Sequence, residues 1–349
     1  MRALLVLILL VSFQVAIKAM EDHKCDLPCQ WSKWKSQYNK SYETLDEEHA
    51  RYNNWLLSFK RVHQDKPKAS FELGLNAFSD WTHEEFTSRL GLRPYLTKDP
   101  LPVNICEKIQ YRPEDPRLSE IDWRSKGMVT SVKNQGQCGS CWAFSAVATI
   151  ESAWAIQAGS LYNISEQELV DCSRPEGNFG CEGGLMDDAF NYTIVNHGLC
   201  LDMEYPYTAK DGKCQPCRPV VTIMGCHDIQ TGNVTENEEA MLVAVSKGPI
   251  SVGVYAGNAL WYHYIGGILD DLDCLPGDID HGVVIVGYGT EAGKDYWIIK
   301  NSWGADWGES GYIRIIRGKN MCRIGQMGTS VQVRRNDLPE PKWDLIDRL

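Results

Sequence analysis

The sequence predicts an α+β protein with two packed halves, preceded by a mainly helical segment. Residues 31–90 carry apolar side chains at the three- and four-residue spacing of helices, a long helix is expected from Cys141, and β-prone runs separated by glycines follow Pro249. Helices first and strands later are typical of an α+β arrangement. The chain has 349 residues, 43% of them hydrophobic, which suffices for a sizeable core. At roughly 100–200 residues per domain, this length allows about two domains.

Composition excludes two broad classes. Lys plus Arg total 35 against 46 Asp plus Glu, a net charge of −11. This acidic balance argues against nucleic acid or an anionic membrane surface as the main partner. No apolar run reaches the roughly 20 residues that a membrane-spanning helix needs. We therefore expect no nucleic-acid partner and no membrane span.

Residues 1–19 are predicted to be a secretory signal peptide. Arg2 precedes an apolar run from Ala3 to Val11, and the small residue Ala19 suits cleavage. The alternative, a buried first helix, fits poorly with the abrupt charge at Glu21. Entry into the secretory pathway explains the 13 cysteines, because disulfides persist in oxidising compartments. Four glycosylation sequons fit the same route, at Asn39, Asn163, Asn191 and Asn233.

The segment 20–116 is expected to contain helices, a short strand and a connector. Five residues recur at helical spacing and share one helix face: Glu47, Arg51, Trp55, Phe59 and Val62. The alternation over 71–75 suggests a short strand. Residues 92–116 are rich in proline and lack periodicity, which predicts an extended connector that proteases attack easily.

The segment 117–349 is expected to begin with helices and end in strands. The long helix from Cys141 should end at Gly159, and Ser165 with Glu168 resembles a capping box that opens another helix. Four short runs are predicted to be strands: Ile250–Tyr255, His281–Tyr288, Tyr296–Lys300 and Tyr312–Ile316.

Three motifs carry candidate chemistry. Residues 135–144 read QGQCGSCWAF, His281 lies in DHGVV, and Asn301 lies in KNSWG. His281 follows Cys141 by 140 residues and Asn301 follows it by 160. A cysteine in this local sequence, with a distant His and Asn, is typical of one group of proteases. From about Trp31 to Val333 the chain resembles a papain-family cysteine protease precursor of the cathepsin L-like branch.

Physical reasons for this chemistry accompany the resemblance. Free cysteine titrates near about 8.5, so a thiol needs help to become the nucleophilic thiolate. The first turn of a helix and a protonated His281 would both favour a Cys141 thiolate. Asn301 would hold the imidazole, and Trp303 would cover that hydrogen bond from water. The resemblance implies that the Gln135 amide and the Cys141 N–H stabilise the oxyanion.

Two alternatives concern the same residues. Cys141 might instead pair with Cys138 as a redox Cys-x-x-Cys motif, although the βαβ pattern expected around such a motif is missing. His281 taken alone would be an ordinary histidine at a strand end. A catalytically inactive homologue, or a protein acting mainly as an inhibitor, would be indicated by loss of the Cys, His or Asn, and none is replaced.

The resemblance implies a papain-like two-domain fold, with a helical left half and a β-barrel-like right half. It implies a cysteine endopeptidase made as a secreted or lysosomal zymogen and acting through an acyl-enzyme intermediate. The implied domains are residues 1–19 (signal), 20–116 (inhibitory prosegment and connector) and 117–349 (peptidase, with 335–349 as a C-terminal extension). The implied substrate-binding residues are Gly183, Gly184, Leu185, Met186, Gly253, Ile279, Gly282, Trp303 and Met327. Because the pocket residues carry no carboxylate, we expect apolar side chains two residues before the scissile bond.

The resemblance also implies three disulfides, Cys138–Cys181, Cys172–Cys214 and Cys274–Cys322. Cys200, Cys217 and Cys226 remain after residue 117, which allows one more bridge and one free thiol unless Cys106 joins. A zinc site from Cys214, Cys217, Cys226 and His227 is conceivable by spacing, but an oxidising compartment favours disulfides. We expect no cofactor and no metal.

The prosegment resembles an intramolecular inhibitor whose connector runs through the cleft. Residues 74–80 match the family's alternating Gly, Asn, Phe and Asp motif, whereas Ser58 and Lys66 depart from the family's usual asparagines. We hypothesise that carboxylates such as Asp80 hold the prosegment while ionised and release it in acid. The alternative is that Asp80 merely caps a turn. The expected partners are polypeptide substrates, this prosegment and cystatin-type inhibitors, with a monomeric enzyme.

Overall fold

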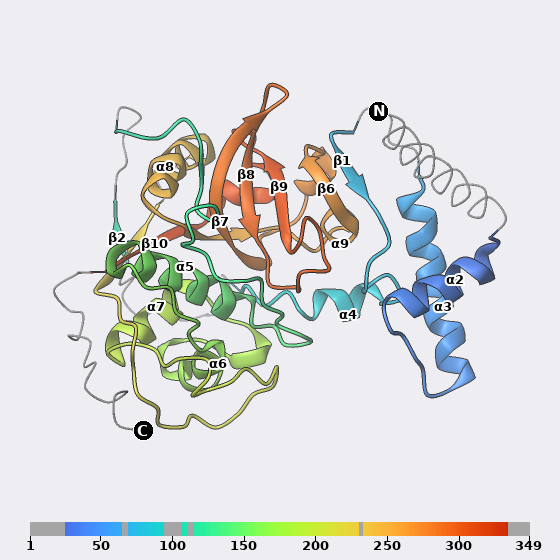
Figure 1. Ribbon diagram of the computed structural model, residues 1–349, viewed down its shortest axis with the longest axis horizontal. Coiled ribbons are helices and arrows are strands. Elements are labelled where there is room, and N and C mark those ends of the chain that lie inside the picture. Colours follow the sequence, from blue (N-terminus) through green and yellow to red (C-terminus); the bar gives the residue numbers. More distant parts are fainter. Residues whose placement is uncertain (1–24, 65–68, 94–105, 110–114, 230–232, 334–349) are drawn as a thin grey trace, which may run out of the picture. The chain divides into compact units, whose positions relative to one another are not determined.

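The computed structural model describes residues 25–64, 69–93, 106–109, 115–229 and 233–333 (Figure 1). The predicted signal peptide, 1–19, and the predicted extension, 335–349, lie outside these residues. The described chain forms two compact units, one made of residues 25–61 with 79–81 and the other of residues 62–78 with 82–333. Each unit is described by itself. Among the described helices, none is long and apolar enough to cross a membrane.

The smaller unit consists of two helices around an aromatic core. Helix α2 spans Leu27–Gln37 and α3 spans Leu45–Val62, which confirms the helical prediction. Asp26 caps α2 by accepting a hydrogen bond from the Cys29 N–H at 3.1 Å. Trp31 stacks on Trp34 with ring centroids 5.2 Å apart and lies 5.5 Å from the fully buried Trp55. Such aromatic pairs stabilise a core beyond the area that they bury.

Asp80 closes this unit. Its carboxylate accepts hydrogen bonds from Lys40 Nζ and from the Tyr42 hydroxyl, each at 2.9 Å, and its side chain is almost fully buried. Its carbonyl oxygen accepts a further bond from Asn54 Nδ2 at 3.1 Å. Asp80 therefore links the turn that follows α2 to α3, a larger role than the capping of a turn.

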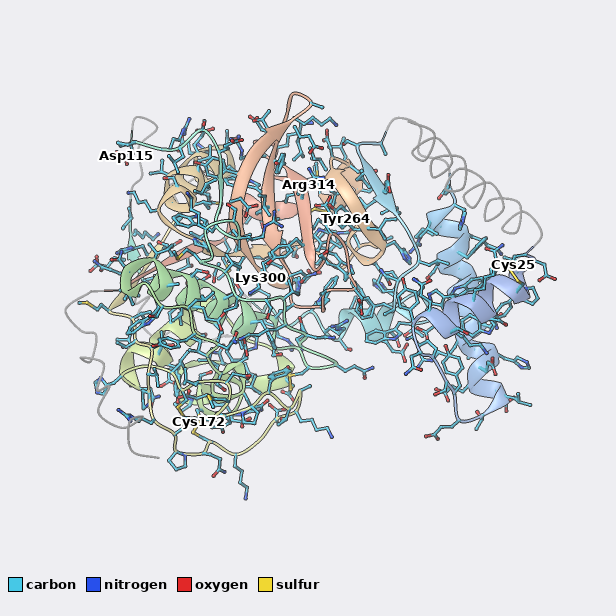
Figure 2. The ribbon with its side chains drawn as sticks, in the orientation of Figure 1. Cys25, Asp115, Cys172, Tyr264, Lys300 and Arg314 are labelled. Atoms are coloured by element: carbon cyan, nitrogen blue, oxygen red, sulfur yellow. A yellow bond between two sulfur atoms is a disulfide. The ribbon has the colours of Figure 1, made fainter. Side chains whose placement is uncertain are left out.

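The larger unit is built on one mixed sheet. Among the described strands the order is β1-β6-β9-β8-β7-β5-β10-β4-β2, and β3 pairs with β7. Strands β6 and β9 are parallel neighbours, and the Tyr264 hydroxyl accepts a hydrogen bond from the Arg314 N–H (Figure 2). The strands are β1 Phe71–Leu73, β2 Glu107–Lys108, β3 Ile121–Asp122, β4 Gly225–Asp228, β5 Ile250–Val254, β6 Tyr264–Leu269, β7 His281–Glu291, β8 Lys294–Lys300, β9 Tyr312–Ile316 and β10 Gly328–Gln332.

The helices of this unit are grouped around α5. Helix α5 runs from Cys141 to Ala158 and ends at Gly159, whose φ of 75° suits a residue without a side chain. It packs against β7, α6 and α7, and most of its side chains are buried (Figure 1). The other helices are α4 His83–Thr87, α6 Glu166–Cys172, α7 Met186–Val195, α8 Val234–Lys247 and α9 Ala259–His263, with 3-10 turns at Arg174–Glu176, Gly180–Glu182, Leu272–Cys274 and Met321–Gln326.

Most predicted elements are present, and the α+β class is confirmed. Only one of the two hydrogen bonds of the predicted capping box forms at α6. The Ser165 hydroxyl accepts from the Glu168 N–H at 3.0 Å, but the Glu168 carboxylate accepts from the Cys200 N–H instead of the Ser165 N–H. The prediction of an extended connector over 92–116 is too simple. Its residues Glu107 and Lys108 form β2, and Cys106 is buried in the core.

Six disulfides join twelve of the thirteen cysteines. They include the three implied pairs, Cys138–Cys181, Cys172–Cys214 and Cys274–Cys322, and three more, Cys25–Cys29, Cys106–Cys226 and Cys200–Cys217. Cys106 pairs with Cys226 and Cys200 with Cys217, so the predicted exception, in which Cys106 joins and no further thiol is left over, is confirmed. Cys141 alone keeps a free thiol.

Candidate active site

Cys141 is the first residue of α5, and its thiol is fully buried. The Gly91 N–H donates a hydrogen bond to its sulfur at 3.3 Å, and the Gly282 amide also faces the sulfur. Burial raises the pKa of the thiol to about 11, although these amides act in the opposite direction. In this form of the protein Cys141 is therefore an uncharged thiol. The Cys138–Cys181 bridge leaves no partner for a redox pair with Cys141.

His281 is the first residue of β7 and is fully buried. Its Nε2 lies 2.8 Å from Asn301 Oδ1. Since a carbonyl oxygen only accepts, Nε2 carries the hydrogen, and Nδ1 of the neutral ring is the atom left to take up a proton. Among the described residues Nδ1 has no hydrogen-bond partner. Burial lowers the pKa of His281 to about 3, and the positive charge of Arg89 adds to this effect.

The start of β7 lies against the first turn of α5. A Cβ placed on Gly282, the residue after His281, would lie 3.2 Å from the Cys141 carbonyl oxygen and 3.3 Å from Trp142 Cα. The strand can approach the helix this closely because Gly282 has no side chain. The Trp303 ring covers the imidazole with its centroid 4.8 Å from that of His281. The sheet thus places the histidine motif beside the helix that begins with Cys141.

Gln135 is buried and held from both ends of its amide. Its Oε1 accepts a hydrogen bond from the Ser302 hydroxyl at 2.7 Å. Its Nε2 donates to the carbonyl oxygens of Arg89 and Cys138, each at 2.9 Å. The Nε2 donor is therefore aimed at a carbonyl oxygen of another chain segment, which is the group that an oxyanion donor must recognise.

Residues 91–93, in the predicted prosegment, lie along the candidate cleft. The Gly91 carbonyl accepts from the Gly184 N–H at 2.8 Å, and the Arg93 N–H donates to the Gly184 carbonyl at 3.3 Å. A Cβ on Gly91 would lie 1.7 Å from the Gly139 carbonyl oxygen, so only glycine fits. The cleft is therefore filled by the chain's own backbone.

Leu92 occupies an apolar pocket next to this backbone. Its side chain is 4% exposed. A Cβ placed on Gly253 would lie only 2.9 Å from Leu92 Cδ2, so the leucine packs directly against this glycine. The same Gly253 position faces Ile279 Cδ1 and Met327 Cβ. Leu185 and Met186 belong to the same buried cluster as Leu92. The structure thus brings together the predicted pocket residues, whereas Gly282 lies between Met186 and Cys141, and Gly183 faces Gly91 and Arg93.

Trp303, whose ring lies next to His281, is also covered by residues of the predicted prosegment. The Phe86 ring meets it edge-on with centroids 5.2 Å apart, and Phe78 does so at 6.1 Å. The buried Arg89 guanidinium lies 5.5 Å from the Trp303 ring and 4.5 Å from Phe78. Prosegment side chains therefore cover both the apolar pocket and the tryptophan side of the site.

A buried ionic cluster fixes the end of β8 next to Asn301. Lys300, labelled in Figure 2, donates to the Thr130 hydroxyl at 2.8 Å, and that hydroxyl donates to Glu151 on α5 at 2.6 Å. Lys133 bridges Glu151 and Glu166 at 2.9 and 2.6 Å. Because every link in this chain is buried or half-buried, it holds the Asn301 end of the strand to α5.

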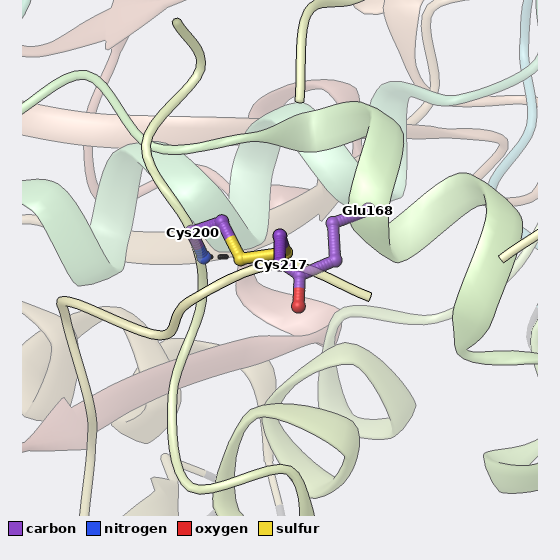
Figure 3. A group of neighbouring side chains, drawn as sticks. All are labelled: Glu168, Cys200 and Cys217. Atoms are coloured by element: carbon purple, nitrogen blue, oxygen red, sulfur yellow. Dashed lines mark hydrogen bonds between the residues drawn. A yellow bond between two sulfur atoms is a disulfide. The ribbon is translucent and has the colours of Figure 1, made fainter. Parts of the chain in front are cut away.

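Two groups of residues carry side chains of types that can bind metal ions. Glu168, Cys200 and Cys217 lie close together, but the two sulfurs form a disulfide and cannot act as thiolate ligands (Figure 3). The Glu168 carboxylate instead accepts from the Cys200 N–H at 2.8 Å. The zinc alternative is wrong, because Cys214, Cys217 and Cys226 are all in disulfides.

The resemblance predicts that the connector runs through the cleft, but not which residues fill it. Arg89 and Gly91 lie before the predicted connector, Leu92 is its first residue, and no motif points to Ser302 between Asn301 and Trp303. The one local signal was the Gly91–Leu92 pair directly after the helical part of the prosegment. The predicted glycosylation residues Asn39, Asn163 and Asn233 are exposed, and Asn191 is half-buried.

Comparisons with known proteins cover most of the chain. The sequence profile described as papain family cysteine protease matches residues 118–332, and that of the cathepsin propeptide inhibitor domain matches residues 31–86. The chain is 41% identical to procathepsin L of Rattus norvegicus, over 83% of this chain and 87% of the relative. It is 40% identical to a cathepsin L-like proteinase of Phaedon cochleariae, over 93% of this chain and 98% of the relative. A solved structure of digestive procathepsin L2 from Tenebrio molitor aligns over 100% of its own length with 88% of this chain. The TM-score is 0.78 and the sequence identity is 33%.

Proposed function

The chain belongs to the papain family of cysteine proteases and carries the family's inhibitory propeptide, and from this premise we propose that it is an endopeptidase zymogen whose nucleophile is Cys141. The papain-like fold, the protease class and inhibition by its own prosegment follow from the family. The roles of individual residues and the substrate preference are the proposal. It places the peptidase at 117–349 and the prosegment at 20–116.

The observation that carries the proposal is the arrangement around Cys141. The only free thiol of the protein lies at a helix N-terminus, and the strand packed on that turn begins with a histidine hydrogen-bonded to Asn301. Once the prosegment leaves, water reaches both groups, and the burial that keeps them neutral is relieved. The Cys141 proton then moves to His281 Nδ1, which gives a thiolate and an imidazolium.

Each step of peptide hydrolysis is then assigned to a residue of the site. The thiolate attacks the peptide carbonyl, and Gln135 Nε2 with the Cys141 N–H stabilises the oxyanion. The imidazolium protonates the leaving amine, and water subsequently hydrolyses the thioester. Asn301 keeps the ring oriented throughout, and Trp303 shields their hydrogen bond.

The position of Leu92 supports the proposed substrate preference. A leucine side chain fills the pocket formed at Gly253, Ile279 and Met327. No pocket residue carries a carboxylate that could pair with a basic side chain. We expect the mature enzyme to cleave a Leu-Arg fluorogenic dipeptide at least tenfold more efficiently than an Arg-Arg dipeptide, and equal efficiencies would refute this preference.

A covalent probe tests the nucleophile. A peptide epoxide should label the mature enzyme, and Cys141→Ser, matured by added active parent enzyme and then separated from it, should not be labelled. The paired variant Cys200→Ser/Cys217→Ser is the control, because it removes two sulfurs of the peptidase unit without leaving an unpaired thiol. Labelling that persists in Cys141→Ser would reject the proposed nucleophile.

The cellular setting completes the proposal. The signal peptide at 1–19, the six disulfides and the four sequons Asn39, Asn163, Asn191 and Asn233 suit secretory proteins that reach the lysosome or the extracellular space. We expect a monomer that cystatin-type inhibitors block. Loss of mass on treatment with an N-glycosidase tests the sequons, with the Asn→Gln variants as controls.

A further inference from the structure

A strand of the connector is fastened to the peptidase unit by a disulfide. Cys106 is 3% exposed and is bonded to Cys226 of β4, with the two Cα atoms 4.5 Å apart. Strand β2 follows directly and pairs in parallel with β4, Glu107 with His227 and Lys108 with Asp228. The Ile109 N–H donates to the Asp228 carbonyl at 3.3 Å.

These contacts make residues 106–109 part of the folded peptidase core. Cys106 belongs to the same buried cluster as Trp142 and Met186, and β4 lies in the main sheet next to β10. The disulfide closes a loop of 120 residues, and such long closures restrict the unfolded chain strongly. A proenzyme connector that is only a disposable linker needs neither the bridge nor the strand.

The position of the bridge along the chain decides what a cut achieves. Leu92 in the cleft lies before Cys106, whereas the boundary proposed for the peptidase, residues 116 and 117, lies after it. Hydrolysis at that boundary breaks one peptide bond, yet it leaves the prosegment bonded to the enzyme through sulfur. An inhibitor held in this way faces its site at an effective concentration of about millimolar.

We propose that the Cys106–Cys226 disulfide is a covalent latch: a cut after Ile109 leaves the inhibitory segment attached until a thiol reductant opens the bond, and only a cut before Cys106 releases it directly. In the reductive route two thiols of the reductant become one disulfide, and Cys106 and Cys226 become two thiols. In the direct route β2 stays on the mature enzyme. The proposal depends on the zymogen organisation but not on the assigned catalytic roles.

The latch is tested in the full-length chain carrying Cys141→Ser, which cannot process itself. One version receives a recognition sequence for a site-specific protease between Ile109 and Arg117, and the matched version receives the same sequence between Arg93 and Cys106. After cleavage and alkylation of free thiols, intact mass is measured under denaturing conditions without reductant. We expect the first version to remain one covalent species that dithiothreitol separates into two. The second should separate without reductant.

Two fragments from the first version without reductant would overturn the proposal. The variant Cys106→Ser/Cys226→Ser should abolish the difference between the two versions. If this variant fails to fold, the comparison in the native framework still decides. The enzyme matured in acid without any thiol reductant gives a second readout: it should contain Cys106, as part of its chain or as a disulfide-linked peptide. An enzyme matured under these conditions without Cys106 would overturn the proposal, whereas an inactive enzyme that keeps the linkage would reject only the proposed catalysis.

Discussion

The Gly91 N–H donates a hydrogen bond to the sulfur of Cys141 at 3.3 Å. The prosegment therefore presents a donor to the proposed nucleophile, where a substrate must present an electrophilic carbonyl carbon. The same segment supplies a carbonyl, that of Arg89, to Gln135. The prosegment thus uses the site's hydrogen-bonding groups without offering the sulfur a bond to attack.

Truncation of Gln135 tests the oxyanion donor. We expect Gln135→Ala to lower kcat of the mature enzyme by about 10²–10³-fold with little change in KM, because the amide acts mainly on the charge of the transition state. Gln137→Ala is the matched control, since Gln137 is exposed two residues away and should retain normal rates. An unchanged kcat in Gln135→Ala would remove this residue from the mechanism.

Truncation of Leu92 tests the closure of the cleft. Removing a buried leucine costs about 2–3 kcal/mol at the lower end of the usual range, which corresponds to roughly 30–150-fold weaker closure. We expect the Leu92→Ala zymogen to react with a peptide epoxide faster by up to that factor, because the open form is more populated. Ser88→Ala, at an exposed position, should react at the rate of the parent zymogen. Equal rates for Leu92→Ala and the parent would show that the pocket contact contributes nothing to latency.

The Asp80 linkage tests the acid lock. Asp80→Asn preserves shape but removes the charge that Lys40 and the Tyr42 hydroxyl bind, a loss of about 1.5–3 kcal/mol for hydrogen bonds to a charged group. We expect this variant to undergo processing closer to neutral pH, where the parent needs about pH 4–5 to protonate its carboxylates. Asp46→Asn is the control, because Asp46 is exposed in the first turn of α3. If both variants keep the parent's pH profile, Asp80 does not hold the lock.

Buried His281 gives the zymogen a pH-dependent stability. Its pKa is lowered to about 3, whereas a histidine in an unfolded chain titrates near about 6.5. Between these values the unfolded state binds the extra proton, so the free energy of unfolding decreases as pH falls, by at most about 1.4 kcal/mol per pH unit. The charges of the neighbouring groups do not change over this range. Arg89, which faces the ring, stays protonated because its pKa is about 10, and Asn301, which holds the ring, does not titrate.

The corresponding measurement is denaturant unfolding of two Cys141→Ser zymogens, one with His281 and one with His281→Gln, between pH 6.5 and pH 4. As pH falls, the unfolding free energy of the His281 form should decrease relative to that of the His281→Gln form. Parallel curves would contradict a neutral buried imidazole. Opening of the cleft is a separate matter: moving the proton from Cys141 to His281 takes up no proton overall, so this pair alone cannot sense acid. Acid activation therefore needs another group, and the Asp80→Asn comparison tests whether Asp80 contributes to it.

Much of the site could be predicted because its signals are local. Cys141 must open a helix that ends at Gly159, and the His281 and Asn301 motifs begin or end β-prone runs, so their backbone placement follows from nearby residues. The capping of α6 shows the limit of such reasoning. Ser165 forms its local bond as predicted, but Glu168 turns to Cys200, 32 residues away, a partner that no local pattern indicates.

The sequence by itself determined the protease family, the helical prosegment, the α+β class and the residue types that the chemistry needs. The tertiary structure decided that Leu92 fills the apolar pocket, that Cys106 pairs with Cys226, and that Cys141 and His281 are held neutral. The reason is physical. Hydrophobic periodicity and capping act over a few residues, whereas burial, disulfide pairing and the electrostatic cost of a charge depend on which distant segments meet.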